Sequence, residues 1–195
     1  MRTIGKAEMV DICLGGGVLG SGGGGSVHEG RMIIDRILSS GPSVDLVSVD
    51  EVDDQAWGAV VAGMGSPAAS KDQPRTSSPK WALEALAGAL GFHADFVVPF
   101  ELGAGNSLTP MQAAIQLGVP VVDADPIGRA VPQIHMTTFH LGGISLSPLA
   151  LATEDGITAV IRSEDAHDME RVARAITSEF GGVAAIACYA LQGRD

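Results

Sequence analysis

The sequence predicts a layered α/β domain in which a mostly parallel sheet is covered by helices on both faces. Continuous apolar runs, typical of strands buried on both sides, alternate along the chain with segments whose apolar residues recur at helical spacing. Aromatic residues make up only 4 % of the chain, so aliphatic and small side chains must fill the core. Because 195 residues are enough to bury such a core, we expect residues 1–195 to form a single domain.

Two helices are expected near the start of the chain, over residues 6–14 and 28–39, with a glycine-rich run between them. Eight glycines lie between Leu14 and Ser26. Glycine loses more backbone entropy on ordering than other residues, so such a run indicates positive φ angles or close approach of the backbone to another group. A glycine turn that leads into a helix also presents free amides, which favour an anion or a polarised carbonyl. The alternative is a flexible linker.

The remaining elements alternate between strand and helix. Apolar or alternating runs predict strands, and helical spacing closed by glycine or proline predicts helices. A polar stretch over residues 68–79 predicts an exposed loop, residues 137–151 have no clear pattern, and the apolar tail over residues 183–191 would add an edge strand or cover a sheet face. The expected strands are 44–49, 57–64, 96–100, 119–125 and 157–161, and the expected helices are 81–90, 109–117 and 165–180.

Polar residues gather where the expected central strands end, and ligands of open parallel sheets bind beyond such ends. Glu101 directly follows an apolar strand, so its carboxylate needs a partner. We expect Arg129 to be that partner, either within a site or as a structural ion pair. Asn106 offers both a donor and an acceptor, which would orient an amide-like substrate.

Asp123 and Asp125 lie two residues apart at the end of the strand expected over residues 119–125. If that strand persists, both carboxylates project from one face, and like charges so close raise the pKa of one of them. Such a pair suits proton transfer or the binding of a hard cation. The alternative is that one aspartate caps the turn that Asp-Pro opens.

The charge and the cysteine content exclude several classes of function. A formal net charge of −11 argues against binding to nucleic acid or to anionic membrane surfaces. No apolar run approaches the roughly 18 residues of a membrane span, and charges near the N-terminus argue against a signal peptide, so we expect a cytoplasmic protein. Cys13 and Cys188 are too few for a disulfide framework and fit small buried hydrophobic residues. A nucleophilic role is the alternative for Cys13, which adjoins the glycine run.

Two further kinds of site are alternatives with weaker motifs. His135 and His140, together with the aspartate pair, would provide ligands for a divalent metal, although their spacing matches no strong zinc motif. The sequence leaves the identity of any cofactor unknown. Residues 20–25 contain a formal G-x-G-x-x-G, and Asp50 follows at a distance suited to a dinucleotide. The segment before Gly20 is expected to be helical, whereas this fingerprint requires a strand.

Three motifs, in their order and spacing, resemble the S-methyl thiohydantoin desulfurase-like family. They are Leu-Gly-Ser-Gly-Gly-Gly-Gly over residues 19–25, Glu-Leu-Gly-Ala-Gly-Asn over residues 101–106 and Val-Val-Asp-Ala-Asp-Pro-Ile-Gly-Arg over residues 121–129. The resemblance covers nearly the whole chain. Members of this family usually carry a C-terminal second domain, so we expect this chain to correspond to the N-terminal domain alone, without the second domain.

The resemblance implies a hydrolase-like reaction on a small five-membered cyclic imide or thiohydantoin, from which the named activity releases a methylthio group. We expect glycine amides to polarise the substrate while an acidic residue across a shared cavity acts as general base. The matching positions are Glu101, Asp123, Asp125 and Arg129 as catalytic residues, and Gly22, Gly23, Gly24, Gly25, Asn106 and Gly128 as substrate-binding residues.

A second hypothesis is a half-site subunit with no complete active site of its own. A partner protein that supplies the missing domain, or a second copy of the chain, would then complete the site around the small-molecule substrate. The apolar tail over residues 183–191 is the surface that we expect to need such a partner. A nucleotide-binding domain is the third hypothesis.

Overall fold

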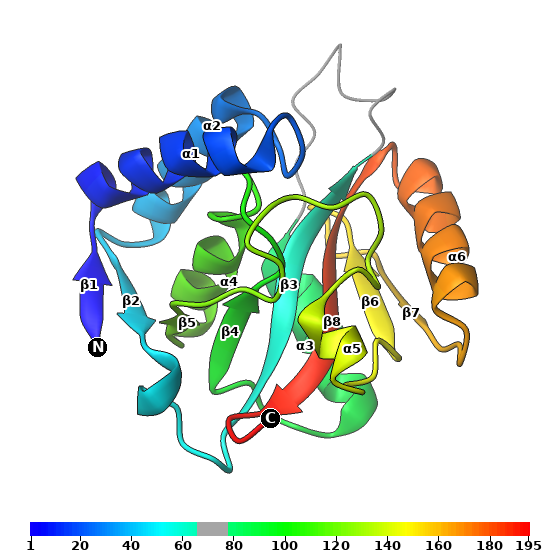
Figure 1. Cartoon of the computed structure of the whole chain (residues 1–195). Helices are drawn as coiled ribbons and strands as arrows, with labels where there is room; N and C mark the ends of the chain where they lie inside the picture. Colours follow the sequence, from blue (N-terminus) through cyan, green and yellow to red (C-terminus); the bar gives the residue numbers. More distant parts are fainter. Residues whose placement is uncertain (66–77) are drawn as a thin grey trace.

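The computed structural model describes residues 1–65 and 78–195, and its strands form one sheet (Figure 1). Within this part of the chain the sheet has eight strands in the order β1-β2-β5-β4-β3-β8-β6-β7. They are β1 (Arg2–Ile4), β2 (Val44–Val47), β3 (Trp57–Gly65), β4 (Phe96–Pro99), β5 (Val121–Val122), β6 (Leu149–Ala152), β7 (Thr158–Ile161) and β8 (Val183–Gln192).

Parallel strands form one half of the sheet, and antiparallel strands extend it. β2, β5, β4 and β3 run parallel, with Val97 of β4 paired with Val121 of β5 and Ala59 of β3. β8 runs antiparallel to β3 and connects it to the antiparallel β6–β7 hairpin, while β1 adds an antiparallel edge next to β2. The carboxyl ends of the parallel strands therefore meet at one edge of the sheet, which is the edge where a ligand is expected.

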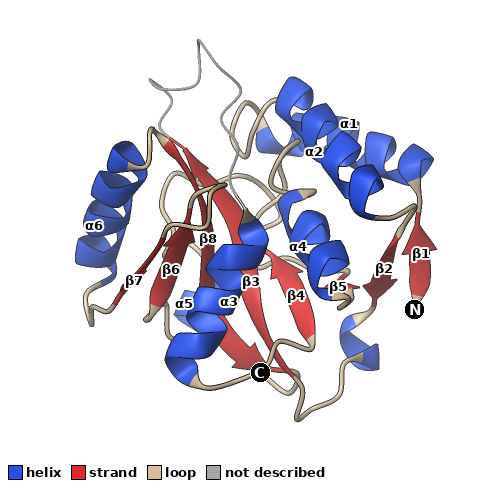
Figure 2. Cartoon of the chain, turned by 180° about the vertical axis from the view of Figure 1, so that it is seen from behind, coloured by secondary structure: helices blue, strands red, loops and turns tan. Residues whose placement is uncertain are grey.

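Helices cover both faces of the sheet (Figure 2), which confirms the predicted layered α/β class. Buried side chains of α1 to α4 share one apolar core with one sheet face, and side chains of α5 and α6 share a second core with the other face. No helix among residues 1–65 and 78–195 is long and apolar enough to cross a membrane. The helices are α1 (Lys6–Gly20), α2 (Val27–Ser40), α3 (Pro79–Leu90), α4 (Thr109–Leu117), α5 (Thr138–Leu141) and α6 (Ala166–Glu179), with a 3-10 turn η1 (Val49–Glu51).

The first half of the glycine-rich run is helical, because α1 continues to Gly20 instead of ending at Leu14. The glycines allow this helix to pack directly on backbone. A Cβ atom added to Gly16 would lie 2.7 Å from the carbonyl oxygen of Gly103, and one added to Gly20 would lie 3.1 Å from the Cα atom of Gly103. Close helix packing therefore explains these glycines, and only residues 21–26 form the turn that leads into α2.

Several strand predictions differ from the structure. β5 contains two residues, not the expected 119–125, because the chain turns away from the sheet after Val122. The apolar tail is the inner strand β8, and its burial against both cores explains its unbroken apolar pattern and removes it as a docking surface. β1 and β6 had no predicted counterpart. The loop predicted over residues 68–79 lies outside the described residues except for Ser78 and Pro79, where α3 and its N-cap are found.

Candidate functional site

Glu101 is a buried carboxyl group just beyond the carboxyl end of β4, with 5 % of its surface exposed. Its Oε1 atom accepts a hydrogen bond from Asn106 Nδ2 at 2.8 Å, and its Oε2 atom accepts one from the backbone amide of Val131 at 2.8 Å. Burial raises the pKa of Glu101 above its ordinary value, the two hydrogen bonds lower it, and the nearby charge of Asp125 raises it, with a net increase.

Asn106 is held rigidly against β3, and this fixes which of its atoms faces Glu101. Its Oδ1 atom accepts a hydrogen bond from the amide of Gly63 at 2.8 Å, and its Nδ2 atom also donates to the carbonyl of Gly63 at 3.2 Å. Both Nδ2 hydrogens are thus used within the protein. Asn106 bridges β3 to Glu101, so its predicted contact with a substrate depends on the remaining lone pair of Oδ1.

The glycine turn lies directly against the segment that carries Glu101. Gly22, Gly24 and Gly25 have φ angles of 96°, 68° and 89°, a region that favours glycine. The carbonyl of Gly24 accepts hydrogen bonds from the amides of Gly105 and Asn106, both at 2.9 Å. A Cβ atom on Gly24 would lie 3.2 Å from Glu101 Oε1. The turn and the segment after β4, far apart in the sequence, therefore lie side by side.

The amides of this turn are not equivalent as donors to a ligand. The amide of Gly23 donates to the carbonyl of Gly20 at 2.8 Å, so it is already used. Within the described part of the chain, the amides of Gly22, Gly24 and Gly25 donate to no partner. These three amides are therefore the ones left to bind an anion or a polarised carbonyl.

Asp123 and Asp125 do not act as a matched pair on one strand face, because β5 ends before them. The Asp123 side chain is exposed, and its backbone amide donates to the carbonyl of Val47 at 2.7 Å. Asp125 Oδ1 accepts hydrogen bonds from the amides of Ile127, at 2.9 Å, and Gly128. Asp125 thus caps the turn that Asp-Pro opens, which was the alternative to a carboxylate pair. Its negative charge raises the pKa of Glu101.

Arg129 is exposed, and its Nε atom donates to the carbonyl of Ala130 at 3.2 Å. The expected ion pair between Arg129 and Glu101 is not formed among the described residues. The carboxylate is satisfied by two neutral donors, so the neighbouring cation is not needed.

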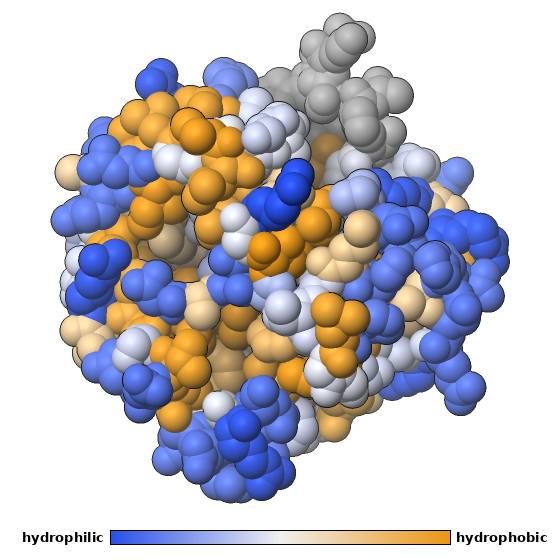
Figure 3. All heavy atoms as spheres, in the orientation of Figure 1, coloured by the Kyte–Doolittle hydropathy of each residue, from blue (hydrophilic) through white to orange (hydrophobic). Residues whose placement is uncertain are grey.

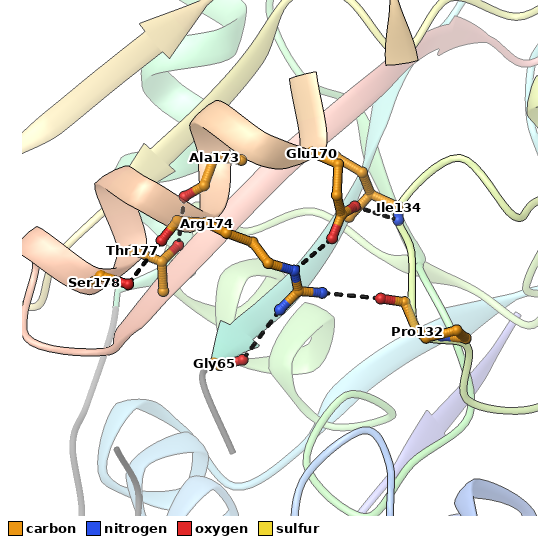
Figure 4. Close-up of polar contacts among 8 residues, drawn as sticks. All are labelled: Gly65, Pro132, Ile134, Glu170, Ala173, Arg174, Thr177 and Ser178. Carbon is orange, nitrogen blue, oxygen red and sulfur yellow. Dashed lines mark hydrogen bonds and ion pairs between the residues drawn. The ribbon is translucent and has the colours of Figure 1, made fainter. Parts of the chain in front are cut away.

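Two residues of α6 also contribute to this region, and the sequence did not indicate them (Figure 4). Glu170 Oε2 accepts a hydrogen bond from the amide of Ile134 at 2.7 Å, and Glu170 Oε1 pairs with Arg174 Nε at 2.5 Å. Their spacing of four residues on an amphipathic helix is a usable signal, but it is also the spacing of ordinary surface ion pairs.

The structure disfavours the alternative roles of the histidines and Cys13, and it confirms that Cys13 is a buried core residue. His135 lies 4.6 Å from His167 and 5.8 Å from His140 between ring centroids. Among residues 1–65 and 78–195, no three His, Cys, Asp or Glu side chains are arranged to hold a metal ion. Cys13 is buried under α2, and burial raises the pKa of its thiol. A packed, protonated thiol does not fit the nucleophile alternative.

The dinucleotide fingerprint lacks its required context, because a helix and not a strand precedes residues 20–25. Asp50 lies in the exposed turn η1.

Of two cavities in the described part of the chain, neither is lined by Glu101 or by the glycine turn, so neither is the shared cavity that we expected. The smaller, about 190 Å³, is mostly apolar and is lined by Asp125 together with Val98, Val122 and Phe139. The larger, about 590 Å³, is lined by His140 and Arg162 next to α6. Exposed apolar side chains of α1 cover the surface next to the glycine turn (Figure 3); they are Leu14, Val18 and Leu19.

Comparisons with known proteins agree with this fold. Residues 7–163 match the model of the S-Me-THD-like, N-terminal domain family. A crystal structure of a protein from Chromobacterium violaceum is 27 % identical, with a TM-score of 0.89, and the similarity covers 99 % of this chain and 56 % of that chain. The chain thus spans just over half the length of that protein. No curated protein matches the sequence.

Proposed function

Because this chain belongs to the S-Me-THD-like family, we propose that it carries a hydrolase-like site for a small cyclic imide or thiohydantoin ring. The observation that carries the proposal is the buried carboxyl group of Glu101, which has a raised pKa and lies against the glycine turn at the carboxyl edge of the parallel strands. A carboxyl group with a pKa nearer neutrality both accepts and returns a proton efficiently.

In the proposed reaction, water attacks the ring carbon that bears the methylthio group. Each oxygen of Glu101 accepts one protein hydrogen bond and retains a lone pair, so the carboxylate can take a proton from that water. The carbon–sulfur bond then breaks, the proton passes from Glu101 to the leaving thiolate, and the remaining hydroxyl proton moves to the ring nitrogen. The products are methanethiol and a ring amide with its carbonyl at the former methylthio carbon. Glu101 ends in its starting state.

The glycine turn supplies the complementary electrostatic part of this proposal. Attack on the ring places negative charge on its nitrogen or carbonyl oxygen, and the amides of Gly22, Gly24 and Gly25 are the donors for that charge. Gly128 belongs to the turn that Asp125 closes, and Asp125 keeps a negative charge near Glu101. Asp123 and Arg129, both exposed, would contact polar groups of the substrate that project from the site.

The test measures thiol release from S-methyl thiohydantoins, and ring opening of hydantoins, by the wild type and by Glu101→Gln. We expect turnover by the variant to fall about 10²–10⁴-fold, because the general base is lost. Glu179→Gln is the matched control, since Glu179 is exposed at the end of α6. Wild-type turnover by a folded Glu101→Gln variant would exclude Glu101 as the base.

A half-site subunit is the second candidate, and one observation favours it. The α1 surface beside the glycine turn exposes 77 % of Val18. A partner protein, or a second copy of the chain, would cover that surface and complete the site. Light scattering after gel filtration tests this candidate. A monomer that turns over substrate unaided contradicts it, whereas an active dimer that Val18→Asp dissociates supports it.

A further inference from the structure

A single irregular segment, residues 125–136, crosses in front of β3 between β5 and α5, and we refer to it as the strap (Figure 1). The strap contains no helix or strand, so its position depends on side chains that bind its backbone. It is also the segment that donates the Val131 amide to Glu101.

Two buried glutamates bind amides of the strap from opposite sides. Glu101, after β4, accepts from Val131, and Glu170, on α6, accepts from Ile134 at 2.7 Å. Because only two residues lie between Val131 and Ile134, a shift at one of the two amides moves the other. Tyr189 adds a further anchor, since its hydroxyl donates to the carbonyl of Ile134 at 3.0 Å.

Arg174 fixes Glu170 and the strap with one planar group (Figure 4). Its guanidinium donates to Glu170 Oε1, to the carbonyl of Pro132 at 2.9 Å and to the carbonyl of Gly65 at 3.4 Å. Only a fork of several fixed donors can satisfy a carboxylate and two carbonyls at once. Pro132 adjoins Val131, so this contact lies one residue from the hydrogen bond to Glu101.

We propose that Glu170 and Arg174 are positioning residues for Glu101, which they hold in register with the Val131 amide through the strap. This inference rests on the proposed role of Glu101. Both residues lie on α6, outside residues 7–163, which are the residues that match the family model.

The expected consequence is a change in the protonation of Glu101. The Val131 hydrogen bond is one of two contacts that lower the pKa of Glu101 against the effect of burial. Asn106 provides the other contact, and Asp125 faces Glu101 with an opposing effect. Asp125 lies at the start of the strap, in a turn closed by its own hydrogen bonds to Ile127 and Gly128, and Asn106 lies outside the strap. If the strap loosens only around residues 131–134, the Val131 hydrogen bond lengthens while Asn106 and Asp125 stay in place, and the pKa of Glu101 rises.

The experiment is a ¹³C NMR titration of glutamate carboxyl groups, in which the Glu101 signal is assigned by its loss in Glu101→Gln. In Arg174→Met we expect the Glu101 midpoint to move to higher pH. Hydrogen exchange at the Val131 amide should accelerate about tenfold or more, because local opening of the strap is no longer restrained. Arg174→Lys keeps the cation but not the fork, and we expect a smaller shift in the same direction.

Arg171→Met is the matched control, since Arg171 is on the same helix and pairs only with exposed Asp168 at 2.9 Å among the described residues. A wild-type Glu101 midpoint in folded Arg174→Met, or an equal shift in Arg171→Met, would overturn the proposal. If Arg174→Met does not fold, the midpoint in Arg174→Lys decides the matter alone. The titration needs no substrate, so it is independent of the turnover assay. If the Glu101 midpoint shifts in Arg174→Met but Glu101→Gln keeps wild-type turnover, the proposed function is contradicted and this inference stands.

Discussion

Glu101 and Glu170 are both buried, and both accept a hydrogen bond from the strap, yet their charges are compensated in different ways. Glu170 faces the guanidinium of Arg174, whereas Glu101 faces a side-chain amide, a backbone amide and the negative charge of Asp125. Neutral donors stabilise a carboxylate less than a cation does. Glu170 is therefore fixed in an ion pair, whereas Glu101 is bound by neutral donors and burial raises its pKa.

The geometry at Glu101 shows how opposing effects act on its pKa. Both of its oxygens face N–H donors, an arrangement that suits the ionised form, while burial disfavours that form. The net effect raises the pKa, which is the direction that suits a carboxyl group for proton transfer. An ion pair such as Glu170–Arg174 provides position instead of proton exchange.

The largest expected effect comes from the glycine that supports the Glu101 region. Gly24→Val places a branched side chain at a φ of 68° and within 2.7 Å of the Cα atom of Gly103. We expect a loss of roughly 3–4 kcal/mol in the free energy of unfolding, measured with urea. Gly22→Val is the control, with a φ of 96° but nothing within 4 Å, and should cost only about 1–2 kcal/mol. Equal losses would show that close packing at Gly24 is unimportant.

The next largest effect is the difference in coupling energy between each glutamate and its side-chain partner. In double-mutant cycles, we expect Glu170→Gln with Arg174→Met to give a coupling energy of about 2 kcal/mol, because the pair is charge-assisted. Glu101→Gln with Asn106→Ala should give about 1 kcal/mol, because its donor is neutral. Urea unfolding of the single and double variants provides both values. A coupling at Glu101 as large as that at Glu170 would remove the proposed distinction.

The smallest expected effect is a dependence of stability on pH. The folded-state pKa of Glu101 is raised, so its protonated form favours folding, and this contribution is complete below the ordinary pKa of about 4.5. The contribution is lost as the pH rises through the folded-state pKa. Unfolding free energies of wild type minus Glu101→Gln should therefore decrease over that window. A flat or rising difference would contradict a raised pKa.

The sequence was sufficient to place the candidate site at the carboxyl edge of the sheet. The apolar runs that became β3 and β4 are long and clear, and Glu101 directly follows one of them. The contact between the glycine turn and this edge agrees with the expectation from the turn and helix pattern. The roles of the individual glycines differ from the expectation, because Gly16 and Gly20 allow close packing of α1 instead of forming the turn. The sequence does not distinguish a glycine in a helix from a glycine in a turn.

The partners of Glu101 and the role of the strap were beyond sequence reasoning. Charge alone favours Arg129 as the partner of Glu101, but Glu101 binds Asn106 and the backbone amide of Val131 instead. Because nearly every residue has a backbone amide, the sequence does not indicate which amide binds Glu101. Glu170 had the spacing of a surface ion pair, and its burial depends on a strap without periodic pattern. The partners of Glu101 and the burial of Glu170 are both determined by contacts between segments far apart in the sequence, which local sequence patterns do not show.

The place of β8 has a consequence for synthesis of the protein. Among the strands of residues 1–65 and 78–195, β8 comes last in the sequence, yet it lies between β3 and β6 and connects the β6–β7 hairpin to the parallel strands. While the nascent chain is still emerging from the ribosome, β3 and β6 each present an unpaired edge that only β8 can fill. Aggregation competes with folding during that interval, which ends when residues 183–192 emerge and insert.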